Sequence, residues 1–140
     1  MIILDTNVLS ELMRPTPEPV VLDWLREQPI LALGTTTINI AEIKYGLARL
    51  PSGQRRRELE KKLSSFMLRG LGGRIFDFDQ SAADCYGDLM VVREKRGRSR
   101  QEMDGLIAAI AQSRGADIAT RNVDNFEGSG VTVVNPWETR

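Results

Sequence analysis

Histidine is absent from this 140-residue sequence, and cysteine occurs once, as Cys85. Without histidine, the Ser-His-Asp triad, the Cys-His pair and histidine-based zinc sites are excluded. A lone cysteine forms no internal disulfide, and Cys85 has no partner at metal-site spacing. The sequence also lacks a signal peptide and any apolar run long enough to cross a bilayer. We therefore expect a cytoplasmic protein that has no contact with a membrane.

The sequence has no net charge, because 19 Lys and Arg residues balance 19 Asp and Glu residues. The chain is therefore not a polycation that binds nucleic acid by composition alone. Its basic residues are clustered, however, within residues 55–62 and 93–100. Acidic residues alternate with the basic residues of the first cluster, a pattern that is typical of a solvated helix face. The second cluster leads toward Asp104. The length suits one domain, residues 1–140, with a core that needs no disulfide.

Short apolar runs alternate with helical patterns along the chain. The predicted strands are residues 2–5, 30–34, 74–78, 117–120 and 131–134, and the predicted helices are residues 7–13, 19–28, 38–50, 53–69, 80–96 and 102–115. Continuous apolar strands suit a parallel sheet that is covered on both faces. The pattern therefore predicts an α/β fold, a three-layer α/β/α sandwich around a central parallel sheet of about five strands.

Three carboxylates stand where the apolar pattern does not require them. Asp5 ends the first strand, Glu42 lies early in the helix after the second strand, and Asp104 lies in the first turn of helix 102–115. A strand end and two helix N-termini share one rim of a parallel sheet, so we expect the three acids to converge. Each acid also has a structural explanation, because Asp5 is a good N-cap and acids near helix N-termini interact favourably with the helix dipole.

Converging carboxylates repel one another and are costly to bury unless a cation compensates them. Hard cations such as Mg²⁺ or Mn²⁺ take oxygen ligands and complete their shells with water and phosphate oxygens. A metal held in this way can activate water and neutralise charge on a phosphodiester. The three acids therefore predict metal-dependent phosphodiester hydrolysis.

An ordered set of motifs resembles the PIN-domain family over the whole length of the chain. The motifs are Asp5-Thr6-Asn7, Ala41-Glu42, Asp104 before an alanine-rich helix, and Ala119-Thr120-Arg121-Asn122. More narrowly, the chain resembles VapC-type ribonuclease toxins of bacterial toxin–antitoxin pairs, and Phe78-Asp79 and Asn135-Pro136-Trp137 are similar to the FitB subgroup. The resemblance implies a Mg²⁺- or Mn²⁺-dependent endoribonuclease whose acids are Asp5, Glu42 and Asp104.

The resemblance also implies a fourth site residue just after the fourth strand, where related sites commonly carry an acid. In this sequence Asn122 stands at that position, and Asp124 follows two residues later. Asn122 can bond a metal-bound water but supplies no charge, whereas Asp124 either replaces it or caps the turn before Phe126. Because an asparagine stands where related sites commonly carry an acid, an alternative stays open. It is a PIN-like protein that binds RNA or a partner and has weak or no catalytic activity.

Further polar residues near these acids are expected to support the site. Thr6 and Asn7 can bond the Asp5 carboxylate or a scissile phosphate and can also cap the first helix, and Thr36 or Thr37 follows the second strand at the same rim. Three arginines are candidates for contacts with RNA phosphates, which give affinity without sequence choice. A position in a solvated loop explains these arginines equally well. These arginines are Arg98, Arg100 and Arg121.

A rival interpretation is phosphotransfer of the haloacid-dehalogenase kind, with Asp77 as the nucleophile and Asp79 as the acid. Residues two apart in a strand share a face, so the geometry is conceivable. The chain lacks a convincing lysine and a distal acid pair for that chemistry. We therefore expect Asp77 at a sheet edge or the surface and Asp79 at the N-cap of the next helix.

The partners implied by the resemblance are an RNA substrate, a small cognate antitoxin whose tail enters the acidic groove, and a second copy of the chain in a homodimer. The predicted helical hairpin, residues 38–69, has more apolar surface than one layer needs. It forms the antitoxin groove, the dimer contact or ordinary core, and the sequence leaves these three alternatives open.

Overall fold

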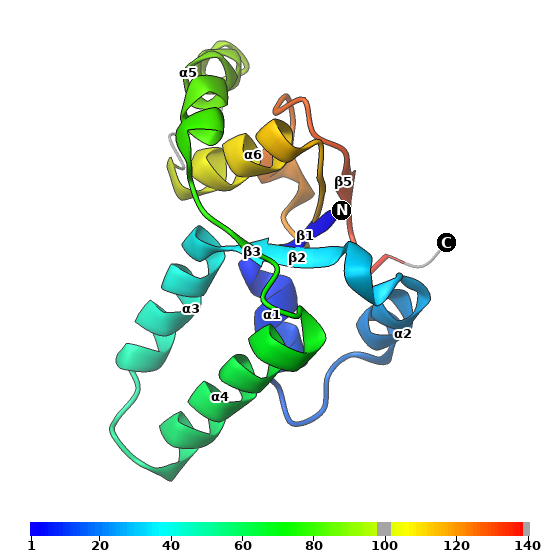
Figure 1. The fold of residues 1–140 in the computed structure, drawn as a ribbon, viewed down its shortest axis with the longest axis vertical. Coiled ribbons are helices and arrows are strands. Elements are labelled where there is room, and N and C mark those ends of the chain that lie inside the picture. Colours follow the sequence, from blue (N-terminus) through cyan, green and yellow to red (C-terminus); the bar gives the residue numbers. More distant parts are fainter. Residues whose placement is uncertain (98–101, 139–140) are drawn as a thin grey trace.

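The computed structural model describes residues 1–97 and 102–138 and has three layers, with a parallel sheet between two sets of helices (Figure 1). The strands lie in the order β3-β2-β1-β4-β5, and every pair is parallel. They are β1 (Ile2–Leu4), β2 (Leu33–Thr36), β3 (Ile75–Phe76), β4 (Asp117–Ala119) and β5 (Val133–Val134). The predicted α/β/α sandwich with five parallel strands is therefore confirmed.

Helices α5 and α6 cover one face of the sheet, and α1 to α4 lie on the other (Figure 1). The helices are α1 (Thr6–Leu12), α2 (Pro19–Glu27), α3 (Thr37–Ala48), α4 (Gln54–Ser65), α5 (Gln80–Lys95) and α6 (Glu102–Arg114). Each face has its own core, because neighbouring residues of a strand point to opposite sides. On β1, Ile3 packs with α5 and α6, whereas Leu4 packs with the helices of the opposite layer. The central strand is thus buried on both faces.

The second strand lies further along the chain than predicted. Residues Ile30–Ala32, predicted as strand, form a 3-10 turn in which Leu31 is 75% exposed. The register pairs Leu33 with Ile2, and the strand continues to Thr36. Thr35 and Thr36, which the prediction left between strand 30–34 and helix 38–50, are therefore buried strand residues. Their hydroxyls have partners, and Thr35 Oγ1 donates to the Leu4 carbonyl at 2.8 Å. The prediction followed the apolar run, but hydrogen-bonded hydroxyls can be buried at little cost.

The remaining boundaries differ less from the prediction. Strands β3 and β5 are shorter than predicted, α1 begins at Thr6 instead of residue 7, and α4 ends in a π-helical turn, Phe66–Gly70. Asp77 is exposed, and Asp79 caps α5 by accepting a 3.0 Å hydrogen bond from the Ala82 amide. Both acids thus lie where the structural interpretation expected them.

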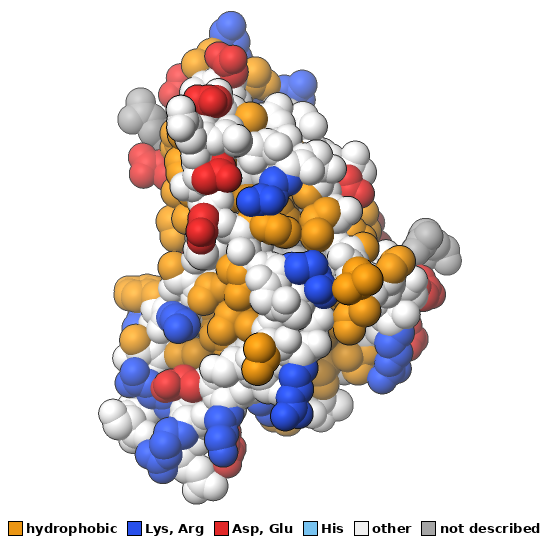
Figure 2. Space-filling view, viewed as in Figure 1, with side chains coloured by type: hydrophobic (Ala, Val, Ile, Leu, Met, Phe, Trp, Pro, Cys, Tyr) orange, Lys and Arg blue, Asp and Glu red, His pale blue; other side chains and the backbone are white. Residues whose placement is uncertain are grey.

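The basic residues of α4 lie on the molecular surface. Figure 2 shows Lys and Arg side chains over the lower part of the molecule, where α3 and α4 lie, and acidic side chains along α5. Arg55, Arg57 and Lys61 are exposed on α4, and Arg56 pairs with Glu60 at 2.9 Å. The solvated helix face expected for this cluster is therefore observed. None of the helices within the described ranges is long and apolar enough to cross a membrane.

Candidate active site

One open cavity of about 510 Å³ lies at the carboxyl end of the sheet and contains the three acids singled out from the sequence. Asp5 follows β1, which pairs with β2 and β4, while Glu42 lies on α3 and Asp104 on α6. The cavity is lined by Asp5, Thr6, Asn7, Ser10, Glu11, Arg14, Glu42, Asp104, Arg121, Asn122 and Trp137. The predicted convergence of a strand end and two helix N-terminal segments is thus present in the fold.

Asp5 is 4% exposed and is held by hydrogen-bond donors from three segments of the chain. Its Oδ1 accepts from the Thr6 amide at 2.8 Å and from Asn39 Nδ2 at 2.9 Å. Its Oδ2 accepts from Thr120 Oγ1 at 2.6 Å. Asp5 is also the N-cap of α1, so it is both an acid of the cavity and the helix cap considered from the sequence.

Asn39, which the sequence interpretation missed, is fully buried and connects several site residues. Its Nδ2 donates to Asp5 and also to Thr6 Oγ1 at 3.0 Å, and its Oδ1 accepts from Thr36 Oγ1 at 2.6 Å. Thr36 therefore reaches the site through Asn39, whereas Thr37 is exposed. The sequence held a signal for Asn39, because it precedes Glu42 by three residues and shares its face of α3.

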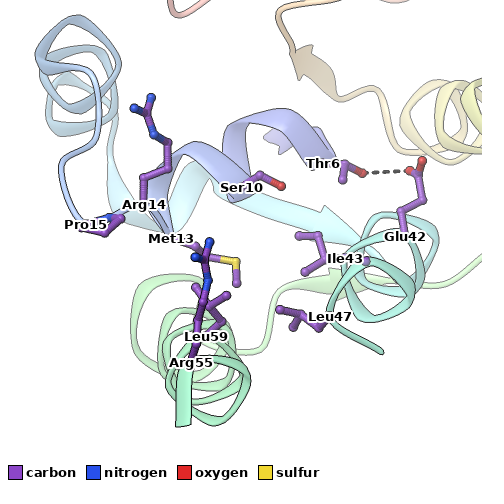
Figure 3. A pocket seen from close by; sticks show the side chains of 11 residues that line it. Thr6, Ser10, Met13, Arg14, Pro15, Glu42, Ile43, Leu47, Arg55 and Leu59 are labelled. Atoms are coloured by element: carbon purple, nitrogen blue, oxygen red, sulfur yellow. Dashed lines mark hydrogen bonds between the residues drawn. The ribbon is translucent and has the colours of Figure 1, made fainter. Parts of the chain in front are cut away.

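Thr6 links the first two acids. Its Oγ1 donates to Glu42 Oε1 at 2.8 Å, a contact drawn in Figure 3, while its amide donates to Asp5. Asn7 reaches Asp5 through Thr120, because Asn7 Nδ2 donates to Thr120 Oγ1 at 3.2 Å. That hydroxyl also accepts from the Asn122 amide at 3.0 Å. Thr120, which the sequence analysis quoted in a motif without giving it a role, thereby connects Asp5 with the segment after β4.

Of the two candidates for the fourth position, Asn122 lines the cavity, whereas Asp124 lies exposed in the 3-10 turn η3 (Val123–Phe126). Arg121 also lines the cavity, with its guanidinium carbon 4.9 Å from the centre of the Trp137 ring. Arg98 and Arg100 fall outside the described residues. Glu11 is an additional acid at the cavity, but it is paired with Arg14 at 2.9 Å and accepts from the Glu18 amide.

The three acids influence one another electrostatically. The pKa of Asp104 is raised to about 6, first by burial and then by the charges of Asp5 and Glu42, which together outweigh the lowering effects of Arg93 and Asn125. Burial also raises the pKa of Glu42, as does the charge of Asp5, while burial raises the pKa of Asp5 against its hydrogen bonds. Ionising all three carboxyls therefore costs free energy that a bound cation would offset.

The acids surround an open space instead of closing around one point. Among residues 1–97 and 102–138, no group of three Asp, Glu or Cys side chains is arranged so that it could hold a metal ion by itself. Mg²⁺ is commonly bound through one or two carboxylates, with waters and substrate phosphates completing its shell. The oxygen donors and the open cavity fit a cation bound in that manner.

A second cavity, of about 290 Å³, lies between α1, α3 and α4. The side chains of Met13, Ile43, Leu47 and Leu59 form its apolar walls, and Arg55 stands beside Leu59 (Figure 3). Thr6, Ser10, Arg14 and Glu42 line both cavities. An apolar pocket thus adjoins the acidic one along the α3–α4 hairpin.

Comparison with known proteins places this α/β/α fold with its acidic cavity in a family. The PIN domain family matches residues 2–128. The VapC ribonuclease Y4jK of Sinorhizobium fredii is 41% identical to this chain over 138 residues, which cover 99% of each protein. Toxin FitB of Neisseria gonorrhoeae is 35% identical over 137 residues, covering 98% of this chain and 99% of FitB. The chain belongs to the PIN-domain family.

The solved structures agree with this assignment. The crystal structure of FitAcB from Neisseria gonorrhoeae superposes with a TM-score of 0.90 at 34% identity, covering 99% of this chain and 100% of the matched chain. The resemblance inferred from the order of the motifs, to VapC-type and FitB-like proteins, is therefore confirmed.

Proposed function

We propose that this protein is a Mg²⁺- or Mn²⁺-dependent endoribonuclease that hydrolyses RNA phosphodiester bonds in the cytoplasm, as the toxin of a toxin–antitoxin pair. The observation that carries the proposal is the cavity shared by Asp5, Glu42 and Asp104, in which each carboxyl has a raised pKa. The similarity to proteins named VapC ribonuclease and toxin FitB supports the same activity.

The cation would be held by one or two of the carboxylates of Asp5, Glu42 and Asp104 at a time, with waters and a substrate phosphate completing its shell and Asn122 bonding a coordinated water. When bound, it supplies an activated water and neutralises charge on the phosphodiester. Asp5 accepts hydrogen bonds from Thr6, Asn39 and Thr120, all of which favour the ionised carboxylate and fix its direction. Glu42 accepts from the Thr6 hydroxyl and is only half-buried. Arg121, held over Trp137 at the cavity wall, is suited to contact an RNA phosphate.

Cleavage of total tRNA and of a defined single-stranded RNA tests this function. Purified protein is compared in Mg²⁺, in Mn²⁺ and in excess EDTA, with Asp5→Asn and Asp77→Asn prepared in parallel. We expect cleavage only with metal, about 1,000-fold slower in Asp5→Asn, and unchanged in Asp77→Asn because Asp77 is exposed away from the cavity.

Cleavage that persists in Asp5→Asn would indicate a contaminating ribonuclease. RNA that is retained but not cut in any metal would instead favour the binding protein that the uncharged Asn122 leaves as the alternative.

We further propose that a cognate antitoxin inhibits this protein by covering the acidic cavity and the apolar pocket beside it. The pocket provides apolar walls next to Glu42, which suits a short protein segment that continues into the acidic cavity. The predicted homodimer would then use other surface, and its interface stays a prediction.

A matched pair of glycine substitutions tests the antitoxin surface. Gly46 lines the apolar pocket, and Gly87 lies on α5, outside both cavities; a Cβ atom added at either glycine meets nothing within 4 Å. Gly46→Leu should fill the pocket and weaken binding of the antitoxin at least about 10-fold, whereas Gly87→Leu should not. Equal affinities of both variants in calorimetry would place the antitoxin elsewhere.

A further inference from the structure

An arginine and a tryptophan that contact each other both line the acidic cavity. Arg121 follows β4 and Trp137 follows β5, and the guanidinium carbon of Arg121 lies 4.9 Å from the centre of the Trp137 ring. The two strands are paired, and just beyond β4 the Thr120 amide donates to the Val134 carbonyl at 2.9 Å. Strand pairing therefore brings both residues to the carboxyl end of the sheet, beside the acids.

The surrounding structure holds Arg121 and Trp137 separately as well as through their contact. The Arg121 amide donates to Asn7 Oδ1 on α1 at 3.2 Å, and the Trp137 amide donates to Asn135 Oδ1 at 2.9 Å. Trp137 is half-buried and packs against the core on the α1 to α4 side of the sheet, whereas Arg121 is exposed. Trp137 is therefore a fixed support, and Arg121 presents the accessible surface.

Packing alone does not explain why residue 137 is a tryptophan. Its Nε1 is buried and has no hydrogen-bond partner within the described part of the chain. A buried N–H without a partner costs free energy, and a phenylalanine ring would fill much of the same space without that cost. Among aromatic side chains, however, the indole attracts a cation most strongly. Trp137 is therefore suited to hold the guanidinium of Arg121.

Two other arginines lie over aromatic rings, away from the site. Arg49, which follows α3, has its guanidinium carbon 5.6 Å from the centre of the Tyr45 ring. Arg114, on α6, lies 4.1 Å from the centre of the Phe76 ring. Neither pair lines the acidic cavity or the apolar pocket. Among residues 1–97 and 102–138, Arg121 alone combines an aromatic support with a position beside the acids.

The exposed guanidinium of Arg121 is a planar cation, and unpaired RNA bases stack on such planes and on aromatic rings. We propose that Arg121, held over Trp137, is a stacking surface for one unpaired base of the RNA, so that this protein cuts RNA at single-stranded nucleotides. The proposal rests on the nuclease function proposed above. A contact with phosphate alone would need the charge but no planar group, and lysine would serve it as a point charge.

Binding of three RNA probes separates stacking from a contact with phosphates. The probes are a short single-stranded RNA, an abasic strand of the same length, which has the phosphates without the bases, and the first strand in a duplex. Affinities are measured by fluorescence anisotropy in EDTA, so that binding does not depend on cleavage.

Three variants change the stacking surface in different ways. Arg121→Lys keeps the charge and loses the plane, Trp137→Phe keeps an aromatic ring, and Trp137→Leu removes the ring. Arg49→Lys is the matched control, because Arg49 also lies over an aromatic ring but lines neither cavity. Urea unfolding shows whether Trp137→Leu, which loses contacts with the core, is still folded.

We expect the wild-type protein to bind the single strand about 10-fold more tightly than the abasic strand or the duplex. Arg121→Lys and Trp137→Leu should lose this preference and bind the abasic strand as the wild-type protein does. Trp137→Phe should retain part of the preference, and Arg49→Lys should retain all of it. The salt dependence of binding should be the same in Arg121→Lys and wild type, because the number of charges is unchanged.

Equal affinities of the wild-type protein for the single and abasic strands would overturn the proposal, as would binding of no probe or an unchanged preference in Arg121→Lys. If Trp137→Leu is unfolded, Arg121→Lys still decides. Metal-dependent cleavage tests the nuclease function separately. Cleavage without a preference for bases would leave the nuclease and remove the stacking surface, whereas a preference for bases without cleavage in any metal would do the reverse.

Discussion

Asp5 stands at the end of β1 and accepts hydrogen bonds from donors on three segments, whereas Asp104 stands on the first turn of α6, where burial and the charges of Asp5 and Glu42 raise its pKa. The first acid is part of the sheet edge, where strand pairing fixes the backbone on both sides. The second is carried by two packed helices and a short turn. We infer that the sheet half of the site is rigid, and that the α5–α6 half is the part that substitutions displace most easily.

The largest effect is expected from Asn39→Ala, which disrupts the half of the candidate site that lies at the sheet edge. The substitution removes the amide that donates to Asp5 and Thr6 in a fully buried position. We expect a loss of about 2–4 kcal/mol in the free energy of unfolding and a fall of about 100-fold in RNA cleavage. Urea unfolding and cleavage rates measure the two effects. Asp104→Asn should lose activity without a loss of stability, and a loss of stability equal to that of Asn39→Ala would contradict the comparison.

Thr120→Val tests the same half with a smaller change. Valine preserves the shape but removes the hydroxyl that donates to Asp5 and accepts from Asn7 and Asn122. We expect about 2 kcal/mol of destabilisation, because two donors and one acceptor lose a partner in a mostly buried setting. Thr120→Ser keeps the hydroxyl and should recover most of the stability. If serine and valine behave alike in urea unfolding, packing and not hydrogen bonding governs this position.

The smallest expected effect is a gain of stability in Asp104→Asn. The folded-state pKa of Asp104, about 6, lies above its ordinary value of 3.8. Ionisation therefore destabilises the metal-free fold progressively as the pH rises from about 4 to about 6, and fully above that range. Asparagine removes the penalty, which we discount to about 1 kcal/mol because the group is only half-buried.

Urea unfolding in EDTA at pH 4 and pH 8 measures this gain, with Asp77→Asn as the control. The gain should appear at pH 8 and disappear at pH 4. A gain of the same size at both pH values would show that charge is not its cause.

The sequence was most informative at positions where few residue types can meet the structural requirement. Short apolar runs indicated the sheet, and an acid at one strand end together with two acids near helix N-termini indicated the cavity. Thr35 and Thr36 were misplaced because a threonine with a hydrogen-bonded hydroxyl is buried as readily as an apolar residue. The roles of Asn39 and Thr120 were missed because they depend on partners far away in the sequence.

Two other residues required the tertiary structure for the same reason. Arg93 belongs to the basic cluster at residues 93–100, which drew attention because it leads toward Asp104, and only the packing of α5 against α6 and η3 reveals that the Arg93 side chain is buried. Asn122 lines the cavity and Asp124 does not, and this difference depends on the 3-10 turn that begins after Asn122. Neither property is visible in a local pattern of residue types.

The pairing of β1 with β4 has a consequence for the way the protein folds. Asp5 receives a hydrogen bond from Thr120, 115 residues further along the chain, and the Asp5 amide donates to the Ala119 carbonyl at 2.9 Å. Contacts between such distant residues form late, because the entropy of closing a long loop opposes them. During synthesis on the ribosome, the acidic cavity is therefore incomplete until β4 has emerged, and the growing chain carries its acids without a working arrangement of them.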